Sequence, residues 1–108
     1  MGEKIHNKLV RDKIPDIIQA DGGEPVVRIL PEDEYRQELL KKLVEEATEL
    51  LESNGSLDER ADVAEVLRAI DELLDFKASD VEQAREQRVD KRGGFKLRIF
   101  LEKVTKAD

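Results

Sequence analysis

Two long amphipathic segments, separated by Asn54-Gly55-Ser56, constrain the fold of this chain more than any other feature. In "PEDEYRQELLKKLVEEATELLES", residues 31–53, the apolar side chains recur every three or four positions, which predicts a core-facing helix. The same spacing from about Leu57 to about Phe76 predicts a second helix that buries Val63, Ala64, Leu67, Ile70 and Leu74. Because only a tight turn joins them, we expect the two helices to pack antiparallel.

Shorter elements flank this hairpin. "DKIPDIIQADGG" reads as a first helix capped by Asp12, and Ser79 and Glu82 form a capping-box pattern for a fourth helix through about Asp90. "VVRIL" at residues 26–30 is β-prone, and the alternating apolar residues at 95–101 suggest a short strand that pairs with it. The expected fold is all-α: an antiparallel bundle of about four helices in a single domain, 1–108, with short β segments near 26–30 and 95–101.

Composition narrows the classes of function. Charged residues make up 42% and aromatic residues 4%, so the core must rest on Leu, Ile and Val, and a homodimer or higher homo-oligomer is expected to cover remaining apolar surface. A net charge of −7 argues against nucleic-acid and anionic-membrane partners. With no cysteine, no apolar run of membrane-spanning length and no signal-like start, a cytoplasmic protein is expected.

Four acids lie at mirror positions about the turn between the two long helices. Glu49 and Glu59 are equidistant from Asn54, as are Glu46 and Asp62, so an antiparallel hairpin brings these carboxylates together. On helical-wheel geometry Glu46 and Glu59 border the apolar stripes, whereas Glu45, Glu52 and Asp58 turn away.

Four clustered carboxylates at a helix seam require a cation or bound protons. Their hard oxygen atoms favour Mg²⁺, Mn²⁺ or Ca²⁺ over Zn²⁺, since His6 is the single histidine. Mg²⁺ typically binds through few carboxylates together with substrate phosphates, so a phosphate ester or anhydride is the expected ligand. The alternative is a merely solvated acidic face, because 26 acids in 108 residues produce such pairs easily.

"EEATE" followed by "ERAD" resembles the Glu-Glu-x-x-Glu and Glu-x-x-Asp signature of the all-α nucleoside triphosphate pyrophosphatases, the MazG superfamily. The flanking stretches "NKLVRDKIP" and "RGGFKLRIFL" resemble a short-chain subgroup of predicted house-cleaning enzymes in that superfamily. The resemblance spans most of the chain. The stretch between Glu49 and Glu59 is shorter than in many members of the superfamily.

The resemblance implies that Glu46, Glu49, Glu59 and Asp62 hold Mg²⁺, with Mn²⁺ as a substitute. It also implies hydrolysis of a nucleoside triphosphate to the monophosphate and pyrophosphate, for which Glu45 or Glu46 is the candidate general base. Two basic clusters near glycine-containing or family-like stretches are candidate phosphate contacts: Lys8, Arg11, Lys13, Lys91, Arg92 and Lys96.

Three functions therefore stay open on sequence grounds. The leading one is a Mg²⁺-dependent pyrophosphohydrolase that removes non-canonical nucleotides. The second is phosphoribosyl-ATP pyrophosphohydrolase of histidine biosynthesis, which shares the all-α fold and chemistry. The third is a non-enzymatic helical interaction module whose acids only solvate the helices.

Overall fold

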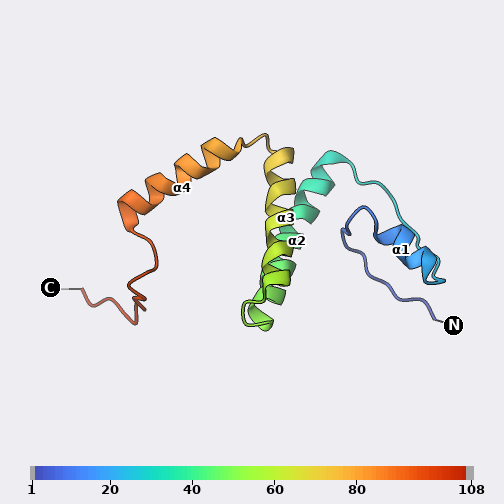
Figure 1. Ribbon diagram of the computed structural model, residues 1–108, viewed down its shortest axis with the longest axis horizontal. Coiled ribbons are helices and arrows are strands. Elements are labelled where there is room, and N and C mark those ends of the chain that lie inside the picture. The colour runs from blue at the N-terminus through green and yellow to red at the C-terminus, as the bar shows by residue number, and fades with distance from the viewer. Residues whose placement is uncertain (1, 107–108) are drawn as a thin grey trace. The chain divides into compact units, whose positions relative to one another are not determined.

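The computed structural model describes residues 2–106 and confirms the all-α prediction. It contains helices α1 (Ile14–Ala20), α2 (Glu32–Glu52), α3 (Leu57–Leu73) and α4 (Ala78–Arg92), as Figure 1 shows. The chain divides into two compact units, one up to Asp75 and one from Phe76 onward. Within the described residues, no helix combines the length and apolar character needed to cross a membrane.

The predicted hairpin of α2 and α3 forms, and local turn chemistry explains its tightness (Figure 1). Asn54 and Gly55 adopt positive φ values of 58° and 90°, which Asn and Gly tolerate best. The Gly55 N–H donates to the Leu50 carbonyl at 3.0 Å and so satisfies a carbonyl at the end of α2. Ser56 then caps α3 by accepting a hydrogen bond from the Glu59 N–H at 3.3 Å.

The core of the hairpin is small and consists of Leu39 from α2 with Val66 and Ile70 from α3. Several half-buried apolar side chains pack around these three: Leu9, Tyr35, Leu43, Ala69, Leu73 and Leu74. The prediction that Ala64 and Leu67 are buried was wrong, because both are exposed. Val66 and Leu67 differ by about 100° around the helix, so a buried face centred on Val66 and Ile70 turns Leu67 outward.

A second apolar stripe on α2 faces away from this core. Leu40, Val44, Ala47 and Leu51 follow a three-and-four spacing, and all four are exposed. In the prediction these residues belonged to or widened the buried stripe, but α3 covers one face of α2 and leaves this one bare. Exposed apolar stripes of this kind are typical of surfaces that another polypeptide covers.

Two predicted helix starts were wrong. Lys13, and not Asp12, occupies the cap position of α1, so Asp12 lies one residue too early to serve. Ser79 lies inside the first turn of α4, whose cap position is Lys77. Glu82 does not reach back to a cap. Its carboxylate pairs instead with Arg85, with a closest contact of 2.6 Å, because a hydrogen bond to a charged group is stronger than one to a backbone N–H.

The predicted β segments were also wrong, since the residues that the structure describes include no strand. Val26 is 98% exposed and Phe95 is 97% exposed, so neither side chain packs within its own unit. Pro25 and Pro31 bracket the first segment, and proline has no N–H to donate to a sheet. In the second segment, the Arg98 N–H donates to the Phe95 carbonyl at 3.0 Å, which closes a turn in place of an extended chain.

The size of the core leads to a direct prediction for stability. Leu39 is 3% exposed, so Leu39→Ala should lower the free energy of unfolding by about 2–5 kcal/mol, as for other buried leucines. The matched control is Leu57→Ala at the start of α3, at a position that is 82% exposed and lies outside the apolar stripe of α2. Urea unfolding followed by circular dichroism measures both; equal losses would show that the assigned core is incorrect.

Candidate metal and phosphate site

Glu46 and Glu59 occupy positions in the helical stripes that form the core. Glu46 follows Leu39 and Leu43 along the inward face of α2 and is only 8% exposed. Glu59 lies two turns before the buried Val66 on α3 and is half-buried. Since α2 and α3 pack along these faces, the hairpin itself brings the two carboxyl groups together.

Glu49 completes a group of three carboxylates. Glu46, Glu49 and Glu59 each offer an oxygen atom, and these three atoms all lie within 4.8 Å of one another. Glu49 lies one turn after Glu46 on α2 and is exposed, so the group extends from the helix interface to solvent. A small ligand can therefore reach the group from outside.

Two oxygens of this group lack any partner. Oε2 of Glu46 and Oε2 of Glu59 are buried, and neither accepts a hydrogen bond. A buried, unpaired carboxylate oxygen costs substantial free energy, because its interactions with water are lost without replacement. These two atoms are the observation that most directly indicates a missing positive ligand.

Lys42 and Lys8 partly offset the negative charge. Lys42 Nζ lies 3.5 Å from Glu46 Oε1 and 3.4 Å from Glu45 Oε2, while Lys8 Nζ lies 3.0 Å from Glu45 Oε1. Lys42 was not among the predicted site residues, although its position four residues before Glu46 is the spacing of a helical ion pair. The prediction that Glu45 turns away was wrong, because Glu45 is half-buried and held between two lysines.

The surroundings shift the pKa of Glu46 upward. Burial is the largest cause, because it disfavours the ionised form, and the neighbouring Glu49 adds to the rise. Lys42 acts in the opposite direction without cancelling these effects, and the charge of Asp62 contributes a smaller increase in the pKa. The protein thus holds an acid that resists ionisation unless positive charge is supplied.

Glu45 shows the opposite behaviour. Its hydrogen bond from Lys8 lowers the pKa of Glu45, and the charge of Lys42 lowers it further. The same contact with Glu45 raises the pKa of Lys8, with smaller contributions from Glu49 and Glu46. The two adjacent glutamates therefore differ: the negative charge of Glu45 is paired with two lysines, whereas that of Glu46 is only partly offset.

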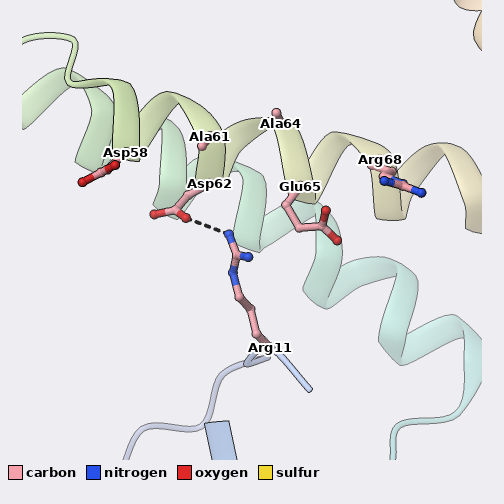
Figure 2. Close-up of a pocket in the computed structure, with 7 residues that line it drawn as sticks. All are labelled: Arg11, Asp58, Ala61, Asp62, Ala64, Glu65 and Arg68. Atoms are coloured by element: carbon pink, nitrogen blue, oxygen red, sulfur yellow. Dashed lines mark hydrogen bonds and ion pairs between the residues drawn. The ribbon is translucent and has the colours of Figure 1, made fainter. Parts of the chain in front are cut away.

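Asp62 stands beside the three-carboxylate group and has a cationic partner of its own. Arg11 Nη2 donates to Asp62 Oδ1 at 2.7 Å. Figure 2 shows Arg11 reaching from the N-terminal segment toward α3, from the side to which Asp58, Asp62 and Glu65 point. A surface hollow of about 530 Å³ lies here, lined by Arg11, Asp58, Ala61, Asp62, Ala64, Glu65 and Arg68.

Four further residues were predicted as phosphate contacts: Lys13, Lys91, Arg92 and Lys96. Lys13 is exposed at the start of α1. Lys91 and Arg92 lie in the last turn of α4, and Lys96 follows Gly94, all in the unit that begins at Phe76. A role for these four residues in binding substrate stays a prediction.

The donor set suits a hard divalent cation. Carboxylate oxygens from two helices converge, two of those oxygens are buried and unpartnered, and the described residues of the group include no nitrogen or sulfur ligand. Mg²⁺ and Mn²⁺ are bound in proteins by such oxygen sets together with water. The residues present therefore fit the cation that the sequence resemblance implies.

Comparison with known proteins finds a similar stretch in another protein but indicates no activity. No protein-family model matches the chain, and no solved structure matches it. A protein of Mycolicibacterium smegmatis (strain ATCC 700084 / mc(2)155) is 54% identical over 43 residues and bears the name "uncharacterized protein". The matched stretch covers 40% of this chain and 44% of that relative, so it spans less than half of either.

The raised pKa of Glu46 predicts how stability depends on pH. Above the ordinary value of 4.5, the folded chain holds a proton at Glu46 that the unfolded chain has released, so stability falls as pH rises through this window. Glu46→Gln removes this effect. In the presence of a chelator, the stability of the variant relative to wild type should therefore increase between about pH 5 and about pH 8.

Urea unfolding at both pH values measures this difference. Glu52→Gln is the matched control, because Glu52 lies on the same helix and is exposed. A relative stability of Glu46→Gln that stays constant or falls as pH rises would refute the assignment.

Proposed function

We propose that this chain is a Mg²⁺-dependent nucleoside triphosphate pyrophosphohydrolase that removes unwanted, non-canonical nucleotides. The observation that carries the proposal is the group formed by Glu46, Glu49 and Glu59, in which two buried oxygens have no partner. The resemblance of "EEATE" and "ERAD" to the signature of such enzymes supports it. A bound cation would offset the repulsion by which these carboxylates otherwise destabilise the hairpin.

Glu46, Glu49 and Glu59 would hold the cation, and Asp62 would join them as the fourth carboxylate. When bound, the cation neutralises phosphate oxygens, lowers the pKa of a coordinated water and stabilises the leaving pyrophosphate. The remaining work falls to side chains of the chain. They position the triphosphate, hold the attacking water and accept its proton.

Glu46 is the better of the two candidate general bases. Glu45 has a lowered pKa and is held by Lys8 and Lys42, so it is a weak proton acceptor. The pKa of Glu46 is raised, which brings it closer to the range that suits a general base. Glu46 would accept the proton through one carboxylate oxygen while its other oxygen binds the cation. In this assignment Glu45 positions Lys8 and Lys42 around the acidic group.

The proposed reaction balances without a nucleophilic side chain. Water loses a proton to the Glu46 carboxylate, and its oxygen forms a bond to the α-phosphorus. The bond from that phosphorus to the oxygen bridging the α and β phosphates breaks, so pyrophosphate leaves with the bonding electrons. The products are a nucleoside monophosphate, pyrophosphate and a proton that Glu46 returns to solvent.

Lys8 and Arg11 are the cations best placed to meet the polyphosphate. Both lie beside the acidic group and are held there by ion pairs, and the side chains of Lys8 and Arg11 are 44% and 57% exposed. Ion pairs of such exposure are weak, so an incoming phosphate can compete for either cation. Arginine suits this role because its planar guanidinium binds two phosphate oxygens at once.

Replacing any one of Glu46, Glu49, Glu59 and Asp62 by its amide should abolish most activity while the helices persist. The amide keeps the shape of the side chain but removes a negative ligand, so pyrophosphate release should fall by about 100-fold or more, as when a group stabilising a transition state is lost. Glu52→Gln is the control, since Glu52 is exposed on the same helix and should retain activity. Pyrophosphate release with Mg²⁺ measures all five variants.

Thermal unfolding with and without Mg²⁺ provides an independent measurement for the same variants. A cation that binds only the folded state raises the unfolding temperature, and the amide variants should lose that increase. Wild-type-like hydrolysis by Glu49→Gln and Asp62→Asn would exclude the four-carboxylate site and favour the helical interaction module. The substrate panel includes canonical triphosphates, modified triphosphates and phosphoribosyl-ATP, so that it separates the two enzyme hypotheses.

We further propose that the chain forms a homodimer or higher homo-oligomer through the exposed stripe of α2. Light scattering should give a mass of at least twice the 12.3 kDa of one chain. Val44→Asp places a charge in the middle of the stripe and should reduce the mass toward that of one chain, because a charge is costly to bury. Ala84→Asp, at an exposed position of α4 outside the stripe, is the control for added charge. A wild-type chain that is monomeric at micromolar concentration would refute the proposal.

A further inference from the structure

Residues 8–11, "KLVR", form a short N-terminal strap across the acidic side of the hairpin. Leu9 packs against the core formed by Leu39, Val66 and Ile70, which fixes the strap in place. Its two ends carry cations: Lys8 contacts Glu45 of α2 at 3.0 Å, and Arg11 contacts Asp62 of α3 at 2.7 Å. One segment of the chain thus supplies a counterion to each helix of the hairpin.

The strap neutralises the edge of the acidic group and leaves its centre bare. Asp62 is paired with Arg11, whereas Oε2 of Glu46 and Oε2 of Glu59 have no partner. The side chain of Glu46 is 11% exposed, and neither cation of the strap forms an ion pair with it. Apart from the contact of Lys42 with Glu46 Oε1, the centre therefore has no cationic partner, while the fourth carboxylate is already paired.

We propose that a divalent cation and Arg11 compete for the Asp62 carboxylate, so that binding of the cation releases the Arg11 guanidinium to contact phosphate. The inference rests on the proposed function and specifies how its site is assembled. Without the cation, Arg11 is the counterion of Asp62, so its own guanidinium is not free to bind an anionic ligand. With the cation, the negative charge of Asp62 is shared, and Arg11 turns to the phosphate that accompanies the metal.

The Arg11–Asp62 pair has the strength that such an exchange requires. The side chains of Arg11 and Asp62 are 57% and 39% exposed, so water screens their attraction and the pair is weak. A divalent cation bound at the centre offers Asp62 a stronger electrostatic partner than one guanidinium does. Leu9 keeps the strap docked on the core, so the released Arg11 stays close to the site.

Titration calorimetry with Mn²⁺ alone tests the competition. Arg11→Gln removes the competitor, so Mn²⁺ should bind about two- to fivefold more tightly, which is the gain expected from losing a partly exposed ion pair. In an Asp62→Asn background the same substitution should leave Mn²⁺ affinity unchanged, because there is no carboxylate left to compete for. Arg11→Lys keeps a positive charge and should restore much of the competition.

Arg68→Gln is the matched control. Arg68 lines the same hollow as Arg11, but its Nε lies 3.6 Å from Glu72 Oε1 and it contacts no residue of the acidic group. Its removal changes the net charge equally, so it reports the general electrostatic effect. Equal tightening by Arg11→Gln and Arg68→Gln, or an Arg11→Gln effect that persists with Asn at position 62, would overturn the competition.

Equilibrium dialysis with inorganic pyrophosphate tests the second half of the proposal. Wild type should retain pyrophosphate when Mg²⁺ is present and not when it is chelated. Arg11→Gln should retain it several-fold less well with Mg²⁺, even though this variant binds the cation more tightly. Undiminished retention by Arg11→Gln would show that Arg11 is only a counterion and would refute its contact with phosphate.

The failure of this inference is distinguishable from failure of the proposed function. A chain that hydrolyses triphosphates without any coupling between Arg11 and Asp62 refutes the competition alone. A chain that shows this coupling toward Mn²⁺ but hydrolyses no triphosphate refutes the enzymatic activity and supports the competition. Urea unfolding of each variant, performed beforehand, establishes that the hairpin is intact.

Discussion

The packing of α2 against α3 is the interaction on which the rest of the first unit depends. Three buried apolar residues hold the hairpin, and the same two helical faces that carry them also carry Glu46 and Glu59. Apolar burial and carboxylate convergence therefore arise from one geometric event. The hairpin cannot form its core without also bringing these acids together, so part of the free energy gained from the apolar contacts offsets repulsion between them.

The positive charges that offset this repulsion are unevenly distributed, and this distribution determines which ligands the site can bind. Lys8, Lys42 and Arg11 pair with Glu45, Glu46 and Asp62 around the periphery. At the centre, one oxygen each of Glu46 and Glu59 stays unpaired, and burial keeps the pKa of Glu46 high. The site thus joins a buried, under-compensated anionic centre to a solvent-exposed cationic edge. That combination suits a metal-bound polyphosphate better than it suits either component alone.

Sequence periodicity predicted α2 and α3 closely but was less successful elsewhere. The i, i+3, i+4 pattern extends over many turns in both helices, so small errors in phase do not change the identification of a helix. Phase errors did change the burial of Leu67 and Ala64, which are exposed beside the buried Val66. The capping pattern at Ser79 and the alternation at Phe95 are short signals. Each was overridden by a local contact, the Glu82–Arg85 pair and the turn closed by Arg98.

The sequence by itself determined the hairpin, the turn at Asn54 and Gly55, and the set of acids equidistant from that turn. These features depend on the spacing of residues along the chain, which can be read directly from the sequence. Tertiary structure alone decided that Lys8 and Arg11 reach Glu45 and Asp62. Pairings across 37 and 51 residues follow from the path of the N-terminal strap over the folded core, and no local pattern in the sequence encodes that path.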